Sequence, residues 1–301
     1  MTTPPVAGLS VCVFAALFAL PHPARAAVDQ SGGAEPLPTA AATSEASSAA
    51  IFDAPAQDDD DAALVLAEPD FRIINLPTTM RLPRFKGHFS MTHRFAGNFR
   101  RGSFADQAAR LFGIDDGAVI GLEYRFGIAR HLELAASRTN FNRTLQLLGK
   151  WDGVRQGSSS PLSASVVVSV EGQNNFQEQH APAVAVSVSR RFGEVAAVHV
   201  VPTWVNNTAS ALGTDESTTF IGLGARVRIR PTVYLAAEVS PRVSGFRAGE
   251  AQFGFAIEKR AGGHMFQLNA TNGSGTTLAQ MARGGQPKNL GLGFNLSRKF
   301  F

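Results

Sequence analysis

The sequence predicts an all-β protein, an antiparallel transmembrane β-barrel of the outer-membrane type with about 12 strands behind a disordered N-terminal tail. Apolar and polar residues alternate with a period of two along short segments from about residue 84 onward, which is typical of strands with one apolar face. Turn residues separate these segments, and no apolar stripe of helical length competes with them. The last segment ends in aromatic residues, as the final strand of such barrels does.

The first 26 residues have the pattern of an export signal. Gly8 to Leu20 are a largely apolar run of 13 residues, too short for a membrane-spanning helix, which needs roughly 20 residues. Ala24-Arg25-Ala26 then fits a small-x-small cleavage site, although no Lys or Arg precedes the apolar run. Cys12 is the single cysteine and lies within this signal, so we expect no disulfide or thiolate chemistry in the exported chain.

Residues 27–70 are rich in Ala, Ser, Pro and acidic residues, with an acidic run at 58–61. Residues 1–70 contain 1 basic and 10 acidic residues, whereas residues 71–301 contain 27 basic and 14 acidic ones. We expect 27–70 to be a disordered tail in the periplasm, because it has too few apolar side chains to bury a core. The basic remainder would suit nucleic acid, but an exported chain is not expected to meet it, so no nucleic-acid partner is predicted.

Residues 71–301 are assigned to the barrel domain. The expected strands are residues 84–95, 117–126, 130–138, 142–151, 162–171, 181–192, 195–204, 217–230, 232–240, 250–259, 262–271 and 288–300. Short and long connections largely alternate between them, as in barrels with tight periplasmic turns and longer external loops. Two connections depart from this rule, since 139–141 is short where a long loop is expected and 152–161 is long where a tight turn is expected.

The last expected strand carries the features of an assembly signal. Leu290, Leu292, Phe294 and Leu296 share one face, and Phe300 rejoins it after Arg298, which leaves Phe301 on the polar face. The residues assigned to this signal are Phe294, Leu296, Phe300 and Phe301, with Phe300 as the effective terminal aromatic. The partners it predicts are outer-membrane lipid and the barrel-assembly machinery that inserts such strands.

A soluble β-sandwich also consists of short alternating strands. The expected strands here are about 9–14 residues long, near the roughly 9–11 residues with which a tilted strand crosses a bilayer. Their polar faces carry many Arg, Glu, Gln and Asn residues, as a wet interior would. These observations favour the barrel.

Several short motifs resemble one family. They are the stretch Gly121 to Leu134 with Ser137-Arg138 and Asn142-Arg143-Thr144, Pro202-Thr203-Trp204 after Arg190-Arg191-Phe192, the stretch Gly262 to Asn272, and Gly293 to Arg298. Together they resemble the bacterial membrane-bound β-barrel family called domain of unknown function 5777, over about residues 80–301. The resemblance implies an outer-membrane barrel and no known activity.

No motif in the sequence indicates a catalytic or metal site, and no cofactor is predicted. His88 and His93 are five residues apart, so in a strand they face opposite sides and make a poor metal pair. No serine lies in a Gly-x-Ser-x-Gly elbow. The glycines Gly222 and Gly224 are interpreted as thin places in a curved sheet.

The most function-like set is the expected lumen face. The side chains expected to point inward are Glu123, Arg125, Glu133, His199, Arg226, Arg228, Arg230, Glu238 and Glu258. Both signs together suggest interior ion pairs that pack the lumen. Alternatively they line a pore, in which a ladder of Arg226, Arg228 and Arg230 would favour anions. The number of twelve strands does not decide between a packed lumen and a pore, since roughly 8 strands enclose a filled interior and roughly 16 an open channel.

Three functions follow from these alternatives. The first is a narrow channel for small solutes, anionic ones if the arginine ladder lines the path. The second is a structural or docking barrel with a packed lumen, which meets a partner through loops 96–116 and 272–287 or through the tail. The third is an outer-membrane hydrolase of lipid or peptide, for which no constellation of three residues stands out.

Overall fold

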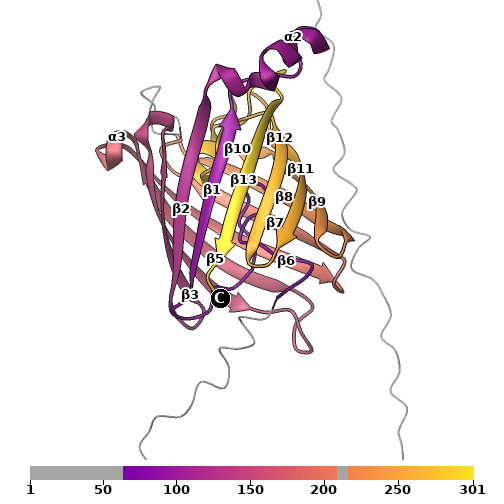
Figure 1. Cartoon of the computed structure of the whole chain (residues 1–301). Coiled ribbons are helices and arrows are strands. Elements are labelled where there is room, and N and C mark those ends of the chain that lie inside the picture. The colour runs from indigo at the N-terminus through magenta and orange to yellow at the C-terminus, as the bar shows by residue number, and fades with distance from the viewer. Residues whose placement is uncertain (1–63, 209–215) are drawn as a thin grey trace, which may run out of the picture. The chain divides into compact units, whose positions relative to one another are not determined.

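The computed structural model describes residues 64–208 and 216–301, which contain a closed barrel of 12 long antiparallel strands (Figure 1). The strands are β1 Gly87–Phe95, β2 Ala118–Ala129, β3 Leu132–Thr139, β4 Leu145–Val154, β5 Ser163–Gly172, β6 Glu178–Phe192, β7 Ala196–Val205, β8 Thr218–Arg230, β9 Val233–Ser240, β11 Gln252–Ala261, β12 His264–Thr271 and β13 Gly291–Lys299. A further strand of three residues, β10 (Arg242–Ser244), pairs with β8. The predicted all-β class and strand number are therefore confirmed.

Pairing of the first strand with the last closes the barrel. Met91 in β1 lies opposite Leu122 in β2 and opposite Leu296 in β13. Every long strand has two antiparallel partners, so the described sheet leaves no long strand with a free edge.

The two ends of the barrel differ. Tight connections such as 193–195 and 262–263 gather at one end, here called the turn end, together with Phe301 (Figure 1). The other end, here called the loop end, carries α2 (Phe104–Ala109), η2 (Leu111–Asp116), η3 (Phe141–Arg143), α3 (Gln173–Phe176) and α4 (Leu278–Ala282). The two exceptions to the alternation are both observed, as the short connection 140–144 at the loop end and the long connection 155–162 at the turn end. No helix in the described ranges is long and apolar enough to cross a membrane.

The strand register places apolar side chains outside and polar ones inside. In β2, Leu122, Tyr124 and Phe126 are exposed, whereas Glu123 and Arg125 between them are buried. Trp151 and Trp204 also lie on the exposed face, while Tyr234 points into the barrel. An apolar outer belt is the surface that lipid covers.

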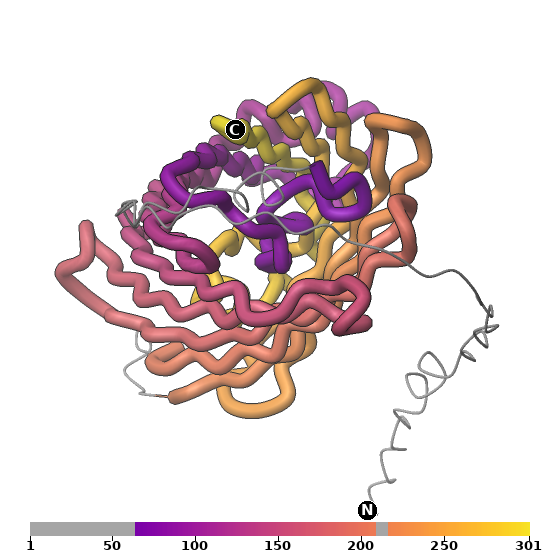
Figure 2. Tube along the Cα trace, turned by 90° about the horizontal axis from the view of Figure 1, so that it is seen from below, coloured from indigo at the N-terminus to yellow at the C-terminus, as the bar shows by residue number. Residues whose placement is uncertain are grey.

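Residues 64–86, here called the plug, enter the lumen from the turn end and return to it (Figure 2). The plug forms a tight hairpin, because the Ile73 N–H donates to the Leu76 carbonyl at 2.9 Å and the Thr78 N–H to the Phe71 carbonyl at 3.0 Å. The apolar residues Phe71, Ile73, Ile74 and Leu76 are all buried. An apolar run of this length cannot form a core of its own, so its side chains are buried against those of the barrel interior.

The plug changes two predicted boundaries. Residues 64–70, assigned to the disordered tail, are part of the plug; Leu64 at its start is exposed, whereas Ala67 and Glu68 are buried. The first strand begins at Gly87 rather than at residue 84, because Phe85 has a positive φ of 61° that no extended strand accommodates. The predicted export signal, the acidic run 58–61 and the rest of residues 1–63 lie outside the described residues.

A second segment fills the lumen from the loop end. In the connection 272–290, the α4 residues Leu278, Ala279, Met281 and Ala282 are buried, so the predicted external docking loop 272–287 instead folds into the barrel. The plug and the connection 272–290 are in contact, because Arg72 of the plug donates from Nη1 to the Thr276 carbonyl at 2.9 Å.

Candidate functional site

The occupied lumen is the candidate functional site, and Glu238 of β9 holds the tip of the plug. Its carboxylate accepts the backbone N–H groups of Ile74, Asn75 and Leu76 at 2.9–3.1 Å and the Asn75 side-chain amide at 2.8 Å. Three consecutive amides around one carboxylate form an anion-binding turn. These bonds satisfy a carboxylate that is almost wholly buried.

The barrel wall also donates to the carbonyl groups of the plug. Arg226 donates to the Arg72 carbonyl at 2.7 Å, Gln267 to the Ile73 carbonyl at 2.5 Å, Asn295 to the Ile74 carbonyl at 2.9 Å, Ser187 to the Pro77 carbonyl at 2.9 Å and Lys299 to the Pro69 carbonyl at 2.8 Å. Polar wall residues therefore bind the plug mainly through its backbone.

Two glycines of β8 make room for the plug. A Cβ atom on Gly222 would lie 2.3 Å from Cδ2 of Leu76, and one on Gly224 would lie 2.2 Å from Cδ1 of Ile73. Side chains at these positions would occupy the space of the plug. The glycines are therefore not only places where a curved sheet lacks side chains, because an aliphatic side chain of the plug packs against each of them.

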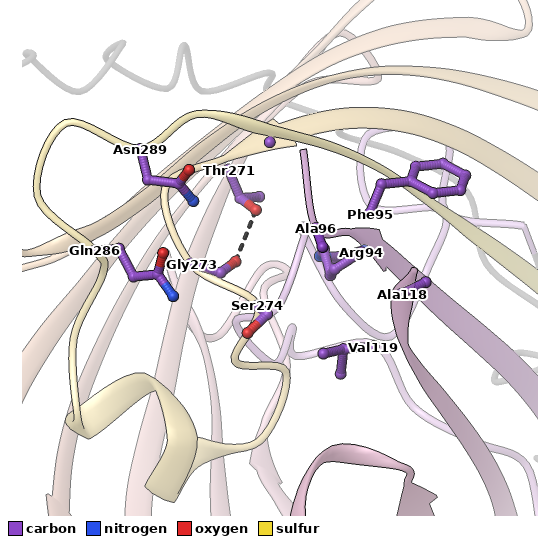
Figure 3. A pocket seen from close by; sticks show the side chains of 11 residues that line it. Arg94, Phe95, Ala96, Ala118, Val119, Thr271, Gly273, Ser274, Gln286 and Asn289 are labelled. Carbon is purple, nitrogen blue, oxygen red and sulfur yellow. Dashed lines mark hydrogen bonds between the residues drawn. The ribbon is translucent and has the colours of Figure 1, made fainter. Parts of the chain in front are cut away.

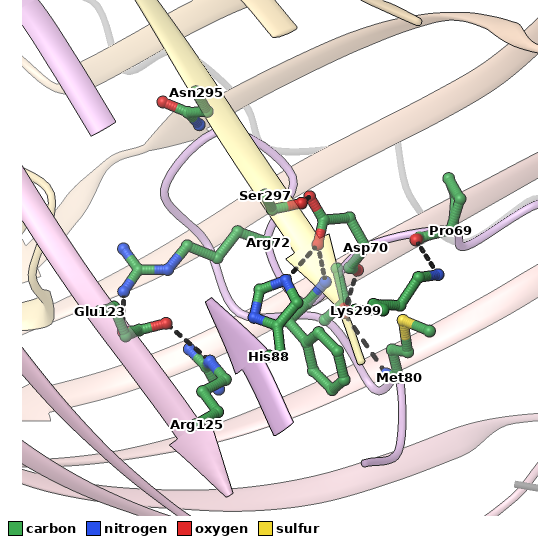
Figure 4. Close-up of polar contacts among 12 residues, drawn as sticks. Pro69, Asp70, Arg72, Met80, His88, Glu123, Arg125, Asn295, Ser297 and Lys299 are labelled. Carbon is green, nitrogen blue, oxygen red and sulfur yellow. Dashed lines mark hydrogen bonds and ion pairs between the residues drawn. The ribbon is translucent and has the colours of Figure 1, made fainter. Parts of the chain in front are cut away.

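Charged residues on β2, β3 and β4 form a continuous interior network. Glu123 accepts from Arg125 Nε at 2.6 Å and is also paired with Arg72 of the plug. Arg125 Nη1 lies 2.8 Å from Glu133, and Lys150 lies 3.6 Å from Glu133 and 3.0 Å from Asp152. Figure 4 shows Arg72 reaching from the plug toward this network. Buried charges of both signs are therefore paired, and the plug completes the set.

Asp70 anchors the plug near the turn end. It lies 3.2 Å from His88 Nε2, and Ser297 Oγ donates to its second oxygen at 2.8 Å (Figure 4). Burial alone would raise the pKa of Asp70, but the hydrogen bond with His88 and the positive charges of His88, Arg226 and Lys299 outweigh it, so this pKa lies well below its usual value. Ser297 donates to the carboxylate rather than to His88, so the trio lacks the contact between nucleophile and base that a catalytic triad needs.

Seven of the nine predicted lumen residues lie inside the barrel. They are Glu123, Arg125, Glu133, His199, Arg226, Glu238 and Glu258. The predicted arginine ladder does not form, because Arg226 is paired with Glu258 at 2.6 Å and Arg228 lies toward the turn end, 3.2 Å from Glu194. Arg230 is exposed beyond a shift in the register between β8 and β9.

The residues of the predicted assembly signal divide between two faces. Phe300 is exposed on the outside, and Phe294 stacks on the outward His93 with ring centroids 4.9 Å apart. Leu296 lies opposite Met91 on the same outer face, whereas Phe301 packs against the plug residues Phe71, Met80 and Leu82. Phe301 therefore touches the plug, and the assembly role of the four residues stays a prediction.

Several wall groups have polar atoms that no described protein group satisfies. Examples are Nε of Arg94, Nη1 of Arg226, the Tyr234 hydroxyl and both ring nitrogens of His199. Buried polar atoms of this kind are normally bound to water. The interior between wall and plug is therefore expected to be hydrated. The described residues contain no cluster of His, Cys, Asp or Glu suited to a metal ion.

A cavity of about 290 Å³ opens beside the loop end, here called the vestibule (Figure 3). Its wall comes from the last residues of β1, the first of β2 and the connection between β12 and β13. Arg94 lines it and reaches down to the plug tip, where Nη2 donates to Asn75 Oδ1 at 2.9 Å.

Sequence reasoning missed the residues that bind the plug, such as Asp70, Arg72, Arg94, Gln267 and Asn295. The inward position of Arg94 could have been found from the alternation with Phe89, Met91 and Phe95. The apolar run from Phe71 to Leu76, directly after an acidic segment, was the available signal for the plug.

Comparisons with known proteins give a family and distant structural likenesses. No curated protein matches the chain. Among solved structures, the NanC porin has a TM-score of 0.46 at 6% identity, with 71% of this chain and 99% of that chain covered. The outer membrane protein Omp33 of Acinetobacter baumannii has a TM-score of 0.40 at 9% identity, covering 72% and 98%. A porin mutant of Rhodopseudomonas blastica has a TM-score of 0.32 at 13% identity, covering 64% and 58%.

The family model described as "Membrane bound beta barrel domain (DUF5777)" matches residues 69–300. The match begins at Pro69, so it includes the plug hairpin as well as the strands. It covers well over half of the chain, and the chain therefore belongs to this family of membrane-bound β-barrels.

Proposed function

We propose that this protein is an outer-membrane channel for small hydrophilic solutes, and that the plug is its gate. The state described here is closed, since the plug fills the lumen from the turn end and the connection 272–290 from the loop end. Release of the plug, together with the connection 272–290 that it binds through the Thr276 carbonyl, would leave a lumen lined by Glu123, Arg226, Glu238 and their neighbours, all on the inner face of the strands.

The observation that carries this proposal is the way in which the plug is bound. Its tip is held by a single carboxylate, Glu238, and its carbonyls by separate side chains, with no strand ladder along the wall beyond the isolated bridge within the hairpin itself. Polar wall atoms without protein partners indicate water beside it. The Arg72–Glu123 ion pair and the contacts of Asp70 also bind the plug, but none of these contacts belongs to the strand pairing of the wall, so the plug can leave without breaking the barrel.

Planar-bilayer recording tests the proposal. The whole chain is expected to conduct rarely, and Glu238→Ala, which releases the tip, is expected to conduct far more often. A Glu238→Ala protein with an intact barrel and a released plug that still shows no conductance would refute the channel.

The packed-lumen docking barrel is the second candidate, and the contact between the plug and the connection 272–290 favours it. Arg72 of the plug bonds Thr276 of the opposite segment, so both halves of the lumen are joined. This candidate predicts no conductance from any plug variant, and a partner that crosslinks to the exposed connection 96–117. A hydrolase ranks third, and release of fatty acid or peptide by the purified protein would revive it.

A further inference from the structure

The vestibule has an unbalanced charge. Of the 11 residues that line it, Arg94 is the only charged one, and no carboxylate is among them. At about 290 Å³ it is near the lower limit of small-molecule sites, which begin at about 300 Å³. Its size and charge suit a small anion.

Arg94 is a buried cation that no carboxylate of the described residues contacts; the Glu238 carboxylate attracts it from a distance and is itself bound by four N–H groups of the plug tip. Its side chain is 2% exposed, and its hydrogen bonds go to neutral groups: Asn295 Oδ1 at 2.7 Å, Asn75 Oδ1 at 2.9 Å and two carbonyls at 3.2–3.3 Å. Its Nε has no partner. The other buried arginines of the wall, Arg125 and Arg226, are each paired with glutamate. A buried guanidinium that no carboxylate contacts retains attraction for an anion.

The opposite side of the vestibule carries neutral polar groups. Ser274, Gln286 and Asn289 stand on the connection between β12 and β13 and lie across the cavity from Arg94 and Val119 (Figure 3). Their side chains form no hydrogen bond with another described residue. Amides and a hydroxyl can both donate and accept, which suits the hydroxyl groups of a solute.

We propose that the vestibule binds a small hydroxylated anion, with its carboxylate or phosphate toward Arg94 and its hydroxyls toward Ser274, Gln286 and Asn289. This inference deepens the proposed function, because it names the solute class and the place where the solute enters. Arg94 also bonds the plug tip through Asn75. A bound anion and a docked plug therefore compete for one guanidinium, so the solute favours release of the plug.

Equilibrium binding to the whole chain in detergent tests the site, with four probes in titration calorimetry. Gluconate and glucose 1-phosphate carry a carboxylate or a phosphate on a hydroxylated chain or ring, sorbitol is the neutral match, and N-methylglucamine is the cationic one. Binding of gluconate, of glucose 1-phosphate or of both, at least tenfold tighter than of sorbitol and N-methylglucamine, is expected. Binding of gluconate shows that the site accepts a carboxylate, and binding of glucose 1-phosphate shows that it accepts a phosphate.

Variants locate the site. Arg94→Gln is expected to weaken anion binding at least tenfold, as the loss of a charge-assisted hydrogen bond would. Lys288→Gln is the matched control, because Lys288 is exposed on the same connection and does not line the vestibule, and its affinity should stay within twofold. Asn75→Ala frees Arg94 from the plug and should tighten binding several-fold. A mobility shift on boiling verifies that each barrel is intact.

Two results overturn the inference: intact protein that binds neither anion, or anion binding that Arg94→Gln leaves unchanged. Binding that Asn75→Ala weakens would overturn the competition for Arg94. These readouts need no conductance, so the two proposals fail separately. Anion binding without conductance would remove the channel alone, and conductance without anion binding would remove the vestibule site alone.

Discussion

Replacement of Glu238 is the perturbation that acts most directly on the plug. The carboxylate accepts four N–H groups of the tip, at 2.8–3.1 Å, and lies in the buried interior. Glu238→Ala removes all four bonds at once and leaves the outer face of β9 unchanged. We expect the barrel to stay closed as a sheet while the plug becomes loose.

The magnitude follows from the number and kind of bonds. A hydrogen bond to a charged group contributes about 1.5–3 kcal/mol. Water that enters the space left by the side chain will satisfy some of the four donors, and contributions at one group are not additive. We therefore expect about 3 kcal/mol of lost docking free energy, which is roughly a 100-fold rise in the population of the released plug. Glu238→Gln keeps one carbonyl acceptor and should raise the population of the released plug by about tenfold.

Thiol labelling measures this population. A chain that begins at residue 27 has no cysteine, so Leu76→Cys places a single thiol on the plug at a fully buried position. The labelling rate by a small maleimide then reports how often the plug is released. Rates are compared between Leu76→Cys alone and Leu76→Cys with Glu238→Ala, so the effect of the cysteine itself cancels. Glu194→Ala is the control, since it removes an exposed carboxylate that pairs with Arg228.

A labelling rate that Glu238→Ala leaves within twofold of the parent, in protein whose barrel is intact by gel mobility, would show that Glu238 does not hold the plug. A rise of equal size with Glu194→Ala would show that any lost carboxylate loosens the protein. Either result refutes the reasoning from the four bonds.

Three further predictions use the labelling assay, the last of them together with the amount of barrel assembled in membranes. Gly224→Leu should release the plug, whereas Gly224→Ala should have a smaller effect because a single Cβ is accommodated by a shift of the Ile73 side-chain end; equal rates would contradict this. The pKa of Asp70 lies below its usual value of 3.8 when the plug is docked, so docking is stabilised above that pH and lost as the pH falls below it. The rate of labelling relative to that of free cysteine at the same pH, which cancels the loss of thiolate, should therefore rise on acidification, and Asp70→Asn should abolish most of that dependence. Phe301→Ala should speed labelling because Phe301 packs against the plug, while Phe300→Ala should instead reduce the amount of assembled barrel in membranes; the reverse pattern would reject this division.

The barrel itself could be predicted because a bilayer imposes one rule on every strand. Most lipid-facing positions must be apolar, so the alternation in β2 or β13 specifies both the strand and its inner face. The inner positions of Glu123, Arg125 and Glu238 follow from that rule without knowledge of the lumen. Strand ends were less certain, since Phe85 and Lys288 adopt positive φ angles that the alternation does not reveal.

The plug could not be predicted, because its partners are remote in the sequence. Ile74 meets Glu238, which is 164 positions away, and neither segment alone indicates the other. A polar inner face predicts either self-paired charge or a pore lining, and both interpretations assume a lumen without an occupant. The wall residues that bind the plug backbone satisfy neither description.

The prediction of an arginine ladder is wrong for a local reason. The alternation places Arg226, Arg228 and Arg230 on one face, but the pairing of β8 with β9 shifts register between Arg228 and Arg230. Such an irregularity turns the last residue away from the lumen. The charged residue that lines a cavity is Arg94 instead, which lies in a strand whose outer face also carries His93.

A crosslink between plug and wall tests the central claim most directly. Leu76→Cys with Gly222→Cys places two thiols where the Leu76 side chain now reaches the glycine, and the chain from residue 27 has no other cysteine. In the Glu238→Ala background, we predict that the oxidised protein does not conduct in a planar bilayer and that reduction of the disulfide restores conductance. Equal conductance before and after reduction, with the crosslink verified by mass, would contradict the claim that the plug gates the barrel.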